Sequence, residues 1–185
     1  MPELPEVETV KSVLKPIIIS HRITAIDVNR KTIILGDVEQ FKKSLMGETF
    51  LDISRVGKYL IFHLTNSKVF ISHLRMEGKF FEIEEKEPDT KYARVVFHLE
   101  NNKKICYDDS RSFGIMKLTD ELHWREEKEI AQLGPEPFAI NDVTYLLDRT
   151  KKSSLPIKSL LLDQTLMTGL GNIYVDEVLY ASQIH

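Results

Sequence analysis

Pro2, Glu3 and Glu6, in the opening run MPELPEVETV, are the residues whose types and spacing point most directly to chemistry. Met1 is normally removed before a small residue such as proline, and its removal would leave Pro2 with a free secondary amine. An α-amino group titrates near pH 8 and a lysine near pH 10.4, so at pH 7 roughly a tenth of the former is unprotonated. A secondary amine that attacks an aldehyde carbon forms an iminium cation, which acts as an electron sink. The two carboxylates could move protons to and from such an adduct, whereas a retained Met1 would leave the Pro2 nitrogen as an unreactive amide.

The same run is also typical of a plain helix start. Pro5 suits a first helical position, and acidic residues suit the positive end of the helix dipole. Apolar residues then recur at spacings of three and four, at Val7, Val10, Leu14 and Ile17. This pattern predicts a helix with one apolar stripe.

Short runs rich in β-branched and aromatic residues follow, and we expect each to form a strand. These runs are Ile23–Val28, Thr49–Ser54, Tyr59–Leu64, Lys68–His73, Phe80–Ile83, Ala93–Leu99 and Lys104–Tyr107. Asn101-Asn102 indicates a hairpin turn, and Asp37–Met46 a short helix that stops at Gly47. The first part of the chain is therefore predicted to be an N-terminal helix plus a two-layer β-sandwich.

After about residue 118 the pattern becomes helical. We expect a charged helix over Thr119–Ala131 and a break at Leu133–Pro137. Further helices are predicted over Asn141–Arg149, Leu155–Asp163 and Asn172–Ser182, the last two joined by a tight turn that contains glycines. The predicted fold class is α+β, with a catalytic β-sandwich domain over residues 1–131 and an incomplete all-α domain over 132–185.

Composition excludes several classes of protein. The 185 residues are 42% hydrophobic and 29% charged, as in ordinary globular proteins, and no apolar run approaches the length of about 20 that a membrane span needs. The single cysteine, Cys106, excludes an internal disulfide and any zinc site built on two or more cysteines of this chain. The N-terminus does not resemble a signal peptide, so we expect a cytoplasmic protein. The net charge of −3 means that any DNA contact would need a local basic patch.

Taken together, the motifs resemble the formamidopyrimidine-DNA glycosylase family, bacterial enzymes that remove oxidised purines from DNA. MPELPEVETV resembles their N-terminus more closely than that of endonuclease VIII, which has glycine at the fourth position. Further matching motifs follow in the family's order over essentially the whole chain: Gly57–Leu60, His73–Met76, Asp108–Gly114, Leu133–Pro137 and Leu162–Glu177. The last of these resembles the family's helix-two-turn-helix element.

The resemblance implies roles for four residues at the reaction centre. Pro2 would attack C1′ of the damaged nucleotide, expel the base and form a Schiff base. Glu3 would open the sugar and shuttle protons, with Glu6 as a supporting carboxylate. Lys58 would contact phosphate and donate a proton during β-elimination, which makes the implied enzyme both a glycosylase and an AP lyase.

Three further residues match those that fill the gap left by an extruded base. Chemistry on a base requires taking it out of the stack. Met76 offers a flexible thioether, Arg111 a planar cation facing the orphaned base, and Phe113 an aromatic wedge. Without the resemblance, Met76 and Phe113 would be interpreted as core residues and Arg111 as a surface charge.

The remaining implied DNA contacts come from several segments. Asn172 opens a helix where backbone N–H groups and an amide could hold a phosphate. Lys158 and Lys151–Lys152 supply positive charge, and His73 is a weaker candidate for a phosphate contact. Tyr92 stands where the family often has a histidine-rich stretch, so this chain departs from the pattern there.

The implied partner is double-stranded DNA that contains oxidised purines or abasic sites, bound by a monomer associated with the bacterial nucleoid. The family continues beyond this point with a loop that closes over the base and a zinc finger with four cysteine ligands. We therefore expect a C-terminally truncated member with no metal or cofactor of its own, and at most weak activity. Two alternatives stay open: a protein that binds damaged DNA without turnover, and an interaction domain whose motifs are relics.

Overall fold

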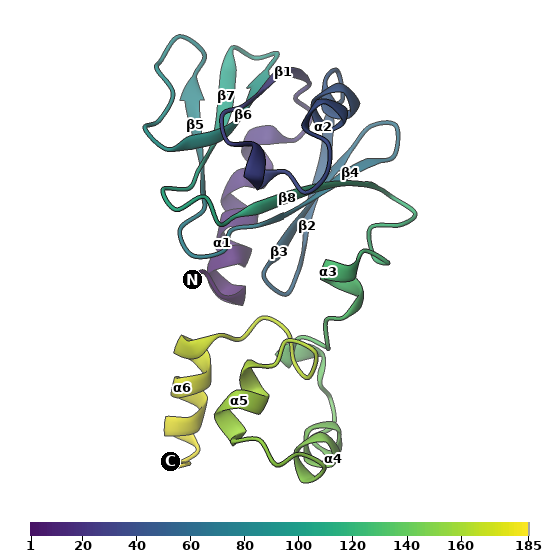
Figure 1. Ribbon diagram of the computed structural model, residues 1–185, viewed down its shortest axis with the longest axis vertical. Helices are drawn as coiled ribbons and strands as arrows, with labels where there is room; N and C mark the ends of the chain where they lie inside the picture. The colour runs from purple at the N-terminus through teal and green to yellow at the C-terminus, as the bar shows by residue number, and fades with distance from the viewer. Residues whose placement is uncertain (185) are drawn as a thin grey trace.

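The computed structural model describes residues 1–184, with a β-sandwich at one end of the long axis and a group of helices at the other (Figure 1). His185, the last residue of the predicted helical domain, lies outside the described residues. One antiparallel sheet has the order β1-β6-β7-β5, formed by β1 (Ile23–Val28), β6 (Ala93–Leu99), β7 (Lys103–Asp108) and β5 (Lys79–Glu84). The other has the order β2-β3-β4-β8, formed by β2 (Phe50–Val56), β3 (Tyr59–Leu64), β4 (Lys68–His73) and β8 (Ile115–Asp120). The predicted α+β class and two-layer sandwich are confirmed.

The N-terminal helix α1 (Leu4–Ile18) packs where the edge strands β2 and β5 of the two sheets lie. Of its predicted stripe, Val7 and Leu14 are buried, and Val10 and Ile17 are partly buried against the core. On the sandwich's other side, the short helix α2 (Val38–Leu45) packs on β1, and the 3-10 helix η1 (Lys31–Ile33) packs on β8. The Asp37 carboxylate accepts the Gln40 N–H and caps α2, as expected for aspartate at this position. Helices therefore cover both open sides of the sandwich.

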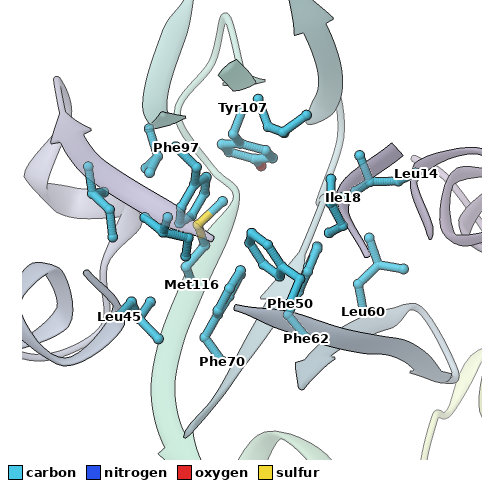
Figure 2. Packing of buried hydrophobic residues seen from close by; sticks show 14 of the residues in the cluster. Leu14, Ile18, Leu45, Phe50, Leu60, Phe62, Phe70, Phe97, Tyr107 and Met116 are labelled. Atoms are coloured by element: carbon cyan, nitrogen blue, oxygen red, sulfur yellow. The ribbon is translucent and has the colours of Figure 1, made fainter. Parts of the chain in front are cut away.

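Aromatic rings fill the space between the sheets (Figure 2). Phe62 and Phe70 stack with ring centroids 4.3 Å apart, and Phe70 meets Phe97 of the opposite sheet at 5.5 Å. Phe50 lies edge-on to Phe70 at 6.4 Å. Phe70 thus joins the two layers, because it packs on rings from both.

The predicted charged helix over Thr119–Ala131 is wrong. Thr119 and Asp120 end β8, which pairs with β4, and only α3 (Lys128–Ala131) is helical. Between them the Asp120 carboxylate accepts the N–H groups of Leu122 and His123, the local bonding by which aspartate favours turns over helices. Trp124 is buried against the outer face of the β2-β3-β4-β8 sheet. Strand pairing and this single aromatic anchor outweigh the helical propensity of the charged residues.

The helical end contains the 3-10 helix η2 (Pro137–Ala139), α4 (Thr144–Lys151), α5 (Ile157–Leu162) and α6 (Asn172–Ala181). The predicted helices are confirmed, with α4 and α5 shorter or shifted by a few residues. They enclose a small apolar cluster of their own, which includes Leu160, Leu161, Leu166, Met167 and Val175. The division of the chain at residue 131 stays a prediction. Within residues 1–184, every helix is too short or too polar to span a bilayer.

The ring stack generates a stability prediction. Replacing Phe70, which is fully buried, with alanine should lower the free energy of unfolding by about 3–5 kcal/mol, because the cavity would face both sheets. The matched control is Phe81→Ala, since the Phe81 side chain is 42% exposed, and it should change stability by less than about 1 kcal/mol. Urea unfolding of both variants measures the difference. Equal small losses would show that the sandwich does not depend on this stack.

Candidate functional site

The N-terminus of the chain meets the helical end at the start of α1. The Leu4 N–H donates to the Gly169 carbonyl at 2.9 Å. Glu3 is the N-cap of α1, and its own N–H donates to the Glu6 carboxylate at 2.9 Å, so the two residues form a capping box. Pro2, partly exposed, precedes this anchored residue directly. The predicted nucleophile is therefore attached to a rigid support.

The Glu3 carboxylate is buried at the first turn of α6. It accepts the N–H of Gly171 at 2.7 Å, that of Ile173 at 2.9 Å and that of Tyr174 at 3.3 Å. A helix N-terminus offers unpaired N–H groups and a positive dipole, so it favours a carboxylate there. Three backbone N–H groups at the start of α6 thus converge on this carboxylate and fix its position.

Gly171 is required by this contact. A Cβ atom at this position would lie 2.5 Å from Glu3 Oε1, closer than real contacts allow. A side chain would push the carboxylate off the helix terminus. The Gly-x-Gly pattern in the sequence thus reflects the approach of Glu3 as well as the turn between helices.

Glu6 is held in its charged form. Burial raises the pKa of its carboxyl, but hydrogen bonds from the Glu3 backbone and the Tyr174 hydroxyl outweigh this, and the net pKa is lowered. The Tyr174 hydroxyl donates to Glu6 at 3.0 Å. This carboxylate can therefore support charge or accept a proton, but it is a poor proton donor.

Lys58 reaches the same place from the turn between β2 and β3. Its side chain is buried, and Nζ donates to the Leu170 carbonyl at 2.5 Å. Burial lowers the pKa of Lys58, partly opposed by the charge of Glu3. Since Leu170 is followed by Gly171, the ammonium and the Glu3 carboxylate are bonded to adjacent residues. A lysine with a lowered pKa is better suited than a solvated one to proton transfer near neutral pH.

A hollow of about 280 Å³ opens beside Lys58, between the sandwich and the helical end. Its lining includes Met1, Tyr59, His73, Arg75 and Gln164. His73 Nδ1 accepts the Arg75 N–H at 2.9 Å, so the ring's other nitrogen carries the proton. The hollow thus presents two cations, Lys58 and Arg75, and one neutral donor, an arrangement that suits an anion such as phosphate.

Met76, Arg111 and Phe113 come together at one end of the β4–β8 pair. Met76 follows β4 and Phe113 precedes β8, and these strands pair through His73 and Ile115. The Phe113 and Met76 side chains are 51% and 45% exposed, which excludes the interpretation as core residues. The Arg111 guanidinium lies 4.6 Å from the centroid of the Phe113 ring. The predicted wedge residues are thus solvent-facing neighbours.

A buried carboxylate fixes the loop that carries Arg111 and Phe113. Asp109 accepts the N–H groups of Arg111, Ser112 and Gly114, at 3.1, 2.9 and 2.7 Å. Tyr92, a predicted DNA contact, is exposed, and its carbonyl accepts the Asp109 N–H at 3.1 Å. Tyr92 therefore supports this loop through its backbone, and its ring lies near the charges of Lys91 and Arg94.

The other predicted DNA contacts are more dispersed. Asn172 is exposed as the first residue of α6, next to the N–H groups that hold Glu3. Lys158 is paired with Asp176 of α6 at 2.6 Å and does not line the Lys58 hollow. Lys152 is exposed at the C-cap of α4, and α4 lies at the end of the molecule away from the N-terminus (Figure 1).

Sequence reasoning missed several residues of this site. Tyr174 and Arg75 lie inside the quoted motifs, where a hydroxyl or guanidinium beside a candidate residue is a usable signal. The Leu170 carbonyl carries no local signal, because it is a main-chain group that Lys58 reaches from 112 positions away. Within residues 1–184, no group of three or more His, Cys, Asp or Glu side chains could hold a metal ion.

The buried histidine generates a prediction about pH. Burial, aided by the charges of Arg75 and Lys58, lowers the pKa of His73 to about 3, against about 6.5 in the unfolded chain. Between these values the unfolded chain binds a proton that the folded chain does not, so stability falls as the pH drops through this window, by roughly 5 kcal/mol in all and by about 3 kcal/mol of that above pH 4.5. His73→Asn keeps an acceptor for the Arg75 N–H without titrating, and should flatten this dependence. Urea unfolding from about pH 7.5 to 4.5 tests it; equal slopes for both chains would contradict the burial argument.

Two family models match the chain. One, described as the formamidopyrimidine-DNA glycosylase N-terminal domain, matches residues 1–116. The other, described as the formamidopyrimidine-DNA glycosylase H2TH domain, matches residues 133–185.

Individual relatives match over the whole chain. The formamidopyrimidine-DNA glycosylase of Streptococcus pneumoniae serotype 4 is 45% identical over 190 residues, which cover 100% of this chain and 68% of that protein. That of Bacillus anthracis is 45% identical over 188 residues, with the same coverage. A crystal structure of Lactococcus lactis Fpg with abasic-site DNA has a TM-score of 0.94 and 40% identity, covering 99% of this chain and 68% of that one. The wild-type Lactococcus lactis enzyme with DNA containing N7-benzyl-Fapy-dG has the same TM-score and identity. By sequence and by fold, this chain belongs to the formamidopyrimidine-DNA glycosylase family.

Proposed function

We propose that this chain is a base excision repair glycosylase with AP-lyase activity, and that its substrate is double-stranded DNA with an oxidised purine or an abasic site. The observation that carries the proposal is the meeting of three groups at the loop that leads into α6. The Leu4 N–H, the Lys58 ammonium and the Glu3 carboxylate are bonded to the consecutive residues Gly169, Leu170 and Gly171. The relatives whose structures contain abasic-site or Fapy-dG DNA support this choice of substrate.

In the proposed reaction, removal of Met1 frees the Pro2 nitrogen. The nitrogen attacks C1′, and the bond from C1′ to the damaged base breaks, so that the base leaves with the bonding electron pair and takes a proton from water. Glu3 takes the proton released by the nitrogen and returns it to O4′ as the C1′–O4′ bond opens, which leaves an iminium ion. Loss of a proton from C2′ then breaks the C3′–O bond, and water hydrolyses the iminium to release the enzyme.

The surrounding residues would serve binding and extrusion of the base. Lys58, with its lowered pKa, is proposed to donate a proton during elimination and to contact phosphate, and Arg75 and His73 add donors in the same hollow. Met76, Arg111 and Phe113 would fill the gap left in the duplex. Asn172 would hold a phosphate at the start of α6, and Lys152 and Lys158 would add weaker electrostatic contacts. We propose that the protein acts as a monomer in the bacterial cytoplasm.

Borohydride trapping tests the nucleophile. On a duplex with one abasic site, we expect a covalent adduct whose intact mass corresponds to the chain without Met1, because only a free Pro2 amine can form the iminium. Pro2→Gln retains Met1, since the enzyme that removes methionine requires a small second residue, and should bind the duplex but give no adduct. Tight binding without an adduct from the correctly processed chain would favour the alternative of a damage-binding protein. An adduct at the mass that includes Met1 would contradict the role of Pro2.

A second test concerns the wedge. Phe113→Ala should slow single-turnover release of an oxidised purine by at least about tenfold, because extrusion loses a contact in a step that costs a few kcal/mol. Trapping on an abasic site should fall less, since no base needs to be extruded there. Phe81→Ala removes a comparably exposed ring outside the wedge and serves as the control. An equal loss of rate on both substrates would show that Phe113 contributes to DNA binding in general and has no special part in extrusion of the base.

A further inference from the structure

Arg55, near the end of β2, joins three segments that are far apart in sequence. Its Nε donates to Glu8 of α1 at 2.7 Å. Its two terminal nitrogens donate to the two carboxylate oxygens of Glu136 at 2.5 and 2.9 Å. One of them also donates to the Gly57 carbonyl at 2.8 Å. We refer to Arg55, Glu8, Glu136 and Gly57 as the Arg55 cluster.

Both backbone groups of Gly57 belong to this cluster. Its carbonyl accepts from Arg55, and its N–H donates to Glu136 Oε1 at 2.8 Å. Gly57 has a φ of +56°, and a Cβ atom there would lie 2.3 Å from Thr168 Oγ1. The turn is therefore bonded on one side and tightly packed on the other, so its peptide groups have little freedom to move.

Lys58 is the residue that this turn presents. Its ammonium is attached to the Leu170 carbonyl, while the backbone that precedes it is attached to Arg55 and Glu136. Lys58 is thereby fixed at both ends of its side chain. The same guanidinium holds Glu8 of α1, the helix that begins at the N-terminus. Arg55 thus connects the Gly57–Lys58 turn to α1, the helix that begins directly after Pro2 and Glu3.

The Arg55 cluster has the burial and the bonding geometry needed to hold the Gly57–Lys58 turn in place. The Arg55 side chain is only 10% exposed and meets Glu136 through a paired, fork-like contact, the most geometrically specific ion pair available to proteins. Burial would lower the pKa of Arg55, but the bonded carboxylates of Glu136 and Glu8 outweigh this and raise it. By contrast, the Lys15–Asp52 pair also joins α1 to β2, yet it is half exposed and touches no part of the turn.

We propose that Arg55 and Glu136 are positioning residues that hold the Gly57–Lys58 turn so that the Lys58 ammonium stays in place at the Pro2–Glu3 site. The inference rests on the role of Lys58 in the proposed function. It assigns no contact with DNA to either residue.

Hydrogen exchange of the unbound chain tests the geometry without reference to activity. Glu136→Met keeps the length of the side chain but removes both carboxylate oxygens, including the Oε1 that accepts the Gly57 N–H. We expect the Gly57 amide to exchange at least about tenfold faster, as a lost protecting hydrogen bond allows. Asp52→Asn alters an ion pair outside the cluster and should leave Gly57 protected. Unchanged exchange at Gly57 in Glu136→Met would overturn the proposal.

Single-turnover strand cleavage of an abasic-site duplex tests the consequence, because Lys58 is proposed to donate a proton in that elimination step. Glu136→Met and Arg55→Lys should each slow cleavage by about 10- to 100-fold, because small misplacements of catalytic groups cost that much. The Kd for the duplex should change by less than about threefold, since neither side chain binds DNA. Asp52→Asn should cleave at the wild-type rate. A slowed reaction with equally weakened binding, or no slowing at all, would overturn the proposal.

A double-mutant cycle with Lys58→Met separates positioning from a merely structural effect. If Glu136 acts through Lys58, adding Glu136→Met to Lys58→Met should slow strand cleavage no further. Additive losses would overturn the proposal. If Lys58→Met alone cleaves at the wild-type rate, the role given to Lys58 in the proposed function fails, and the exchange experiment still reports whether the cluster holds the turn.

Discussion

The contact between the Glu3 carboxylate and the first turn of α6 is the interaction on which the rest of this site depends. It joins the third residue of the chain to residues 171–174, and so brings the N-terminus to the helical end. The same carboxylate completes the positive end of α6, which would otherwise leave N–H groups buried without partners. Because one group serves both purposes, the position of the predicted nucleophile and the packing of α6 cannot be altered separately. Because unpaired N–H groups would cost free energy, the N-terminal residues and α6 keep their relative positions.

Two further sets of hydrogen bonds connect the sandwich to the helical end alongside the Glu3 contact. The Leu4 N–H bonds the Gly169 carbonyl, and the Thr168 N–H bonds the Pro135 carbonyl, so the loop before α6 is held from both ends. The Arg55 cluster ties the segment at Glu136 to the sandwich. These contacts are hydrogen bonds of defined direction, whereas the apolar clusters of the sandwich and of the helical end are separate. Polar contacts thus set the alignment at the junction, and apolar packing stabilises each side of it.

The parts of this structure that the sequence could predict are those whose cause is local. Tyr59–Leu64, Lys68–His73 and Ala93–Leu99 are strands as expected, because β-branched and aromatic residues in short runs suit a buried sheet. The helix expected over Thr119–Ala131 failed because its evidence was charge and propensity, while the real determinants were pairing of Lys68 with Asp120 and burial of Trp124. The candidate residues Glu3 and Lys58 could be proposed from motifs, but their partners could not. Gly171 and Leu170 lie 168 and 112 positions away from Glu3 and Lys58, and they make these contacts through main-chain groups, which leave no mark in a sequence.

The net charge of −3 does not describe the local charge of the surface near the site. The carboxylates there are already bonded: Glu3 to backbone amides, Glu8 and Glu136 to Arg55. The cations near the site contact neutral groups or face the hollow. Lys58 donates to a carbonyl, Arg111 lies on the ring of Phe113, and Arg75 lines the hollow beside Lys58. A phosphate that approaches this end of the sandwich would therefore meet cations whose charge is not cancelled by a bonded carboxylate, although the chain as a whole is acidic. Since screening limits interactions between exposed charges to about 8–10 Å at physiological salt, this local arrangement outweighs the distant excess of acidic residues.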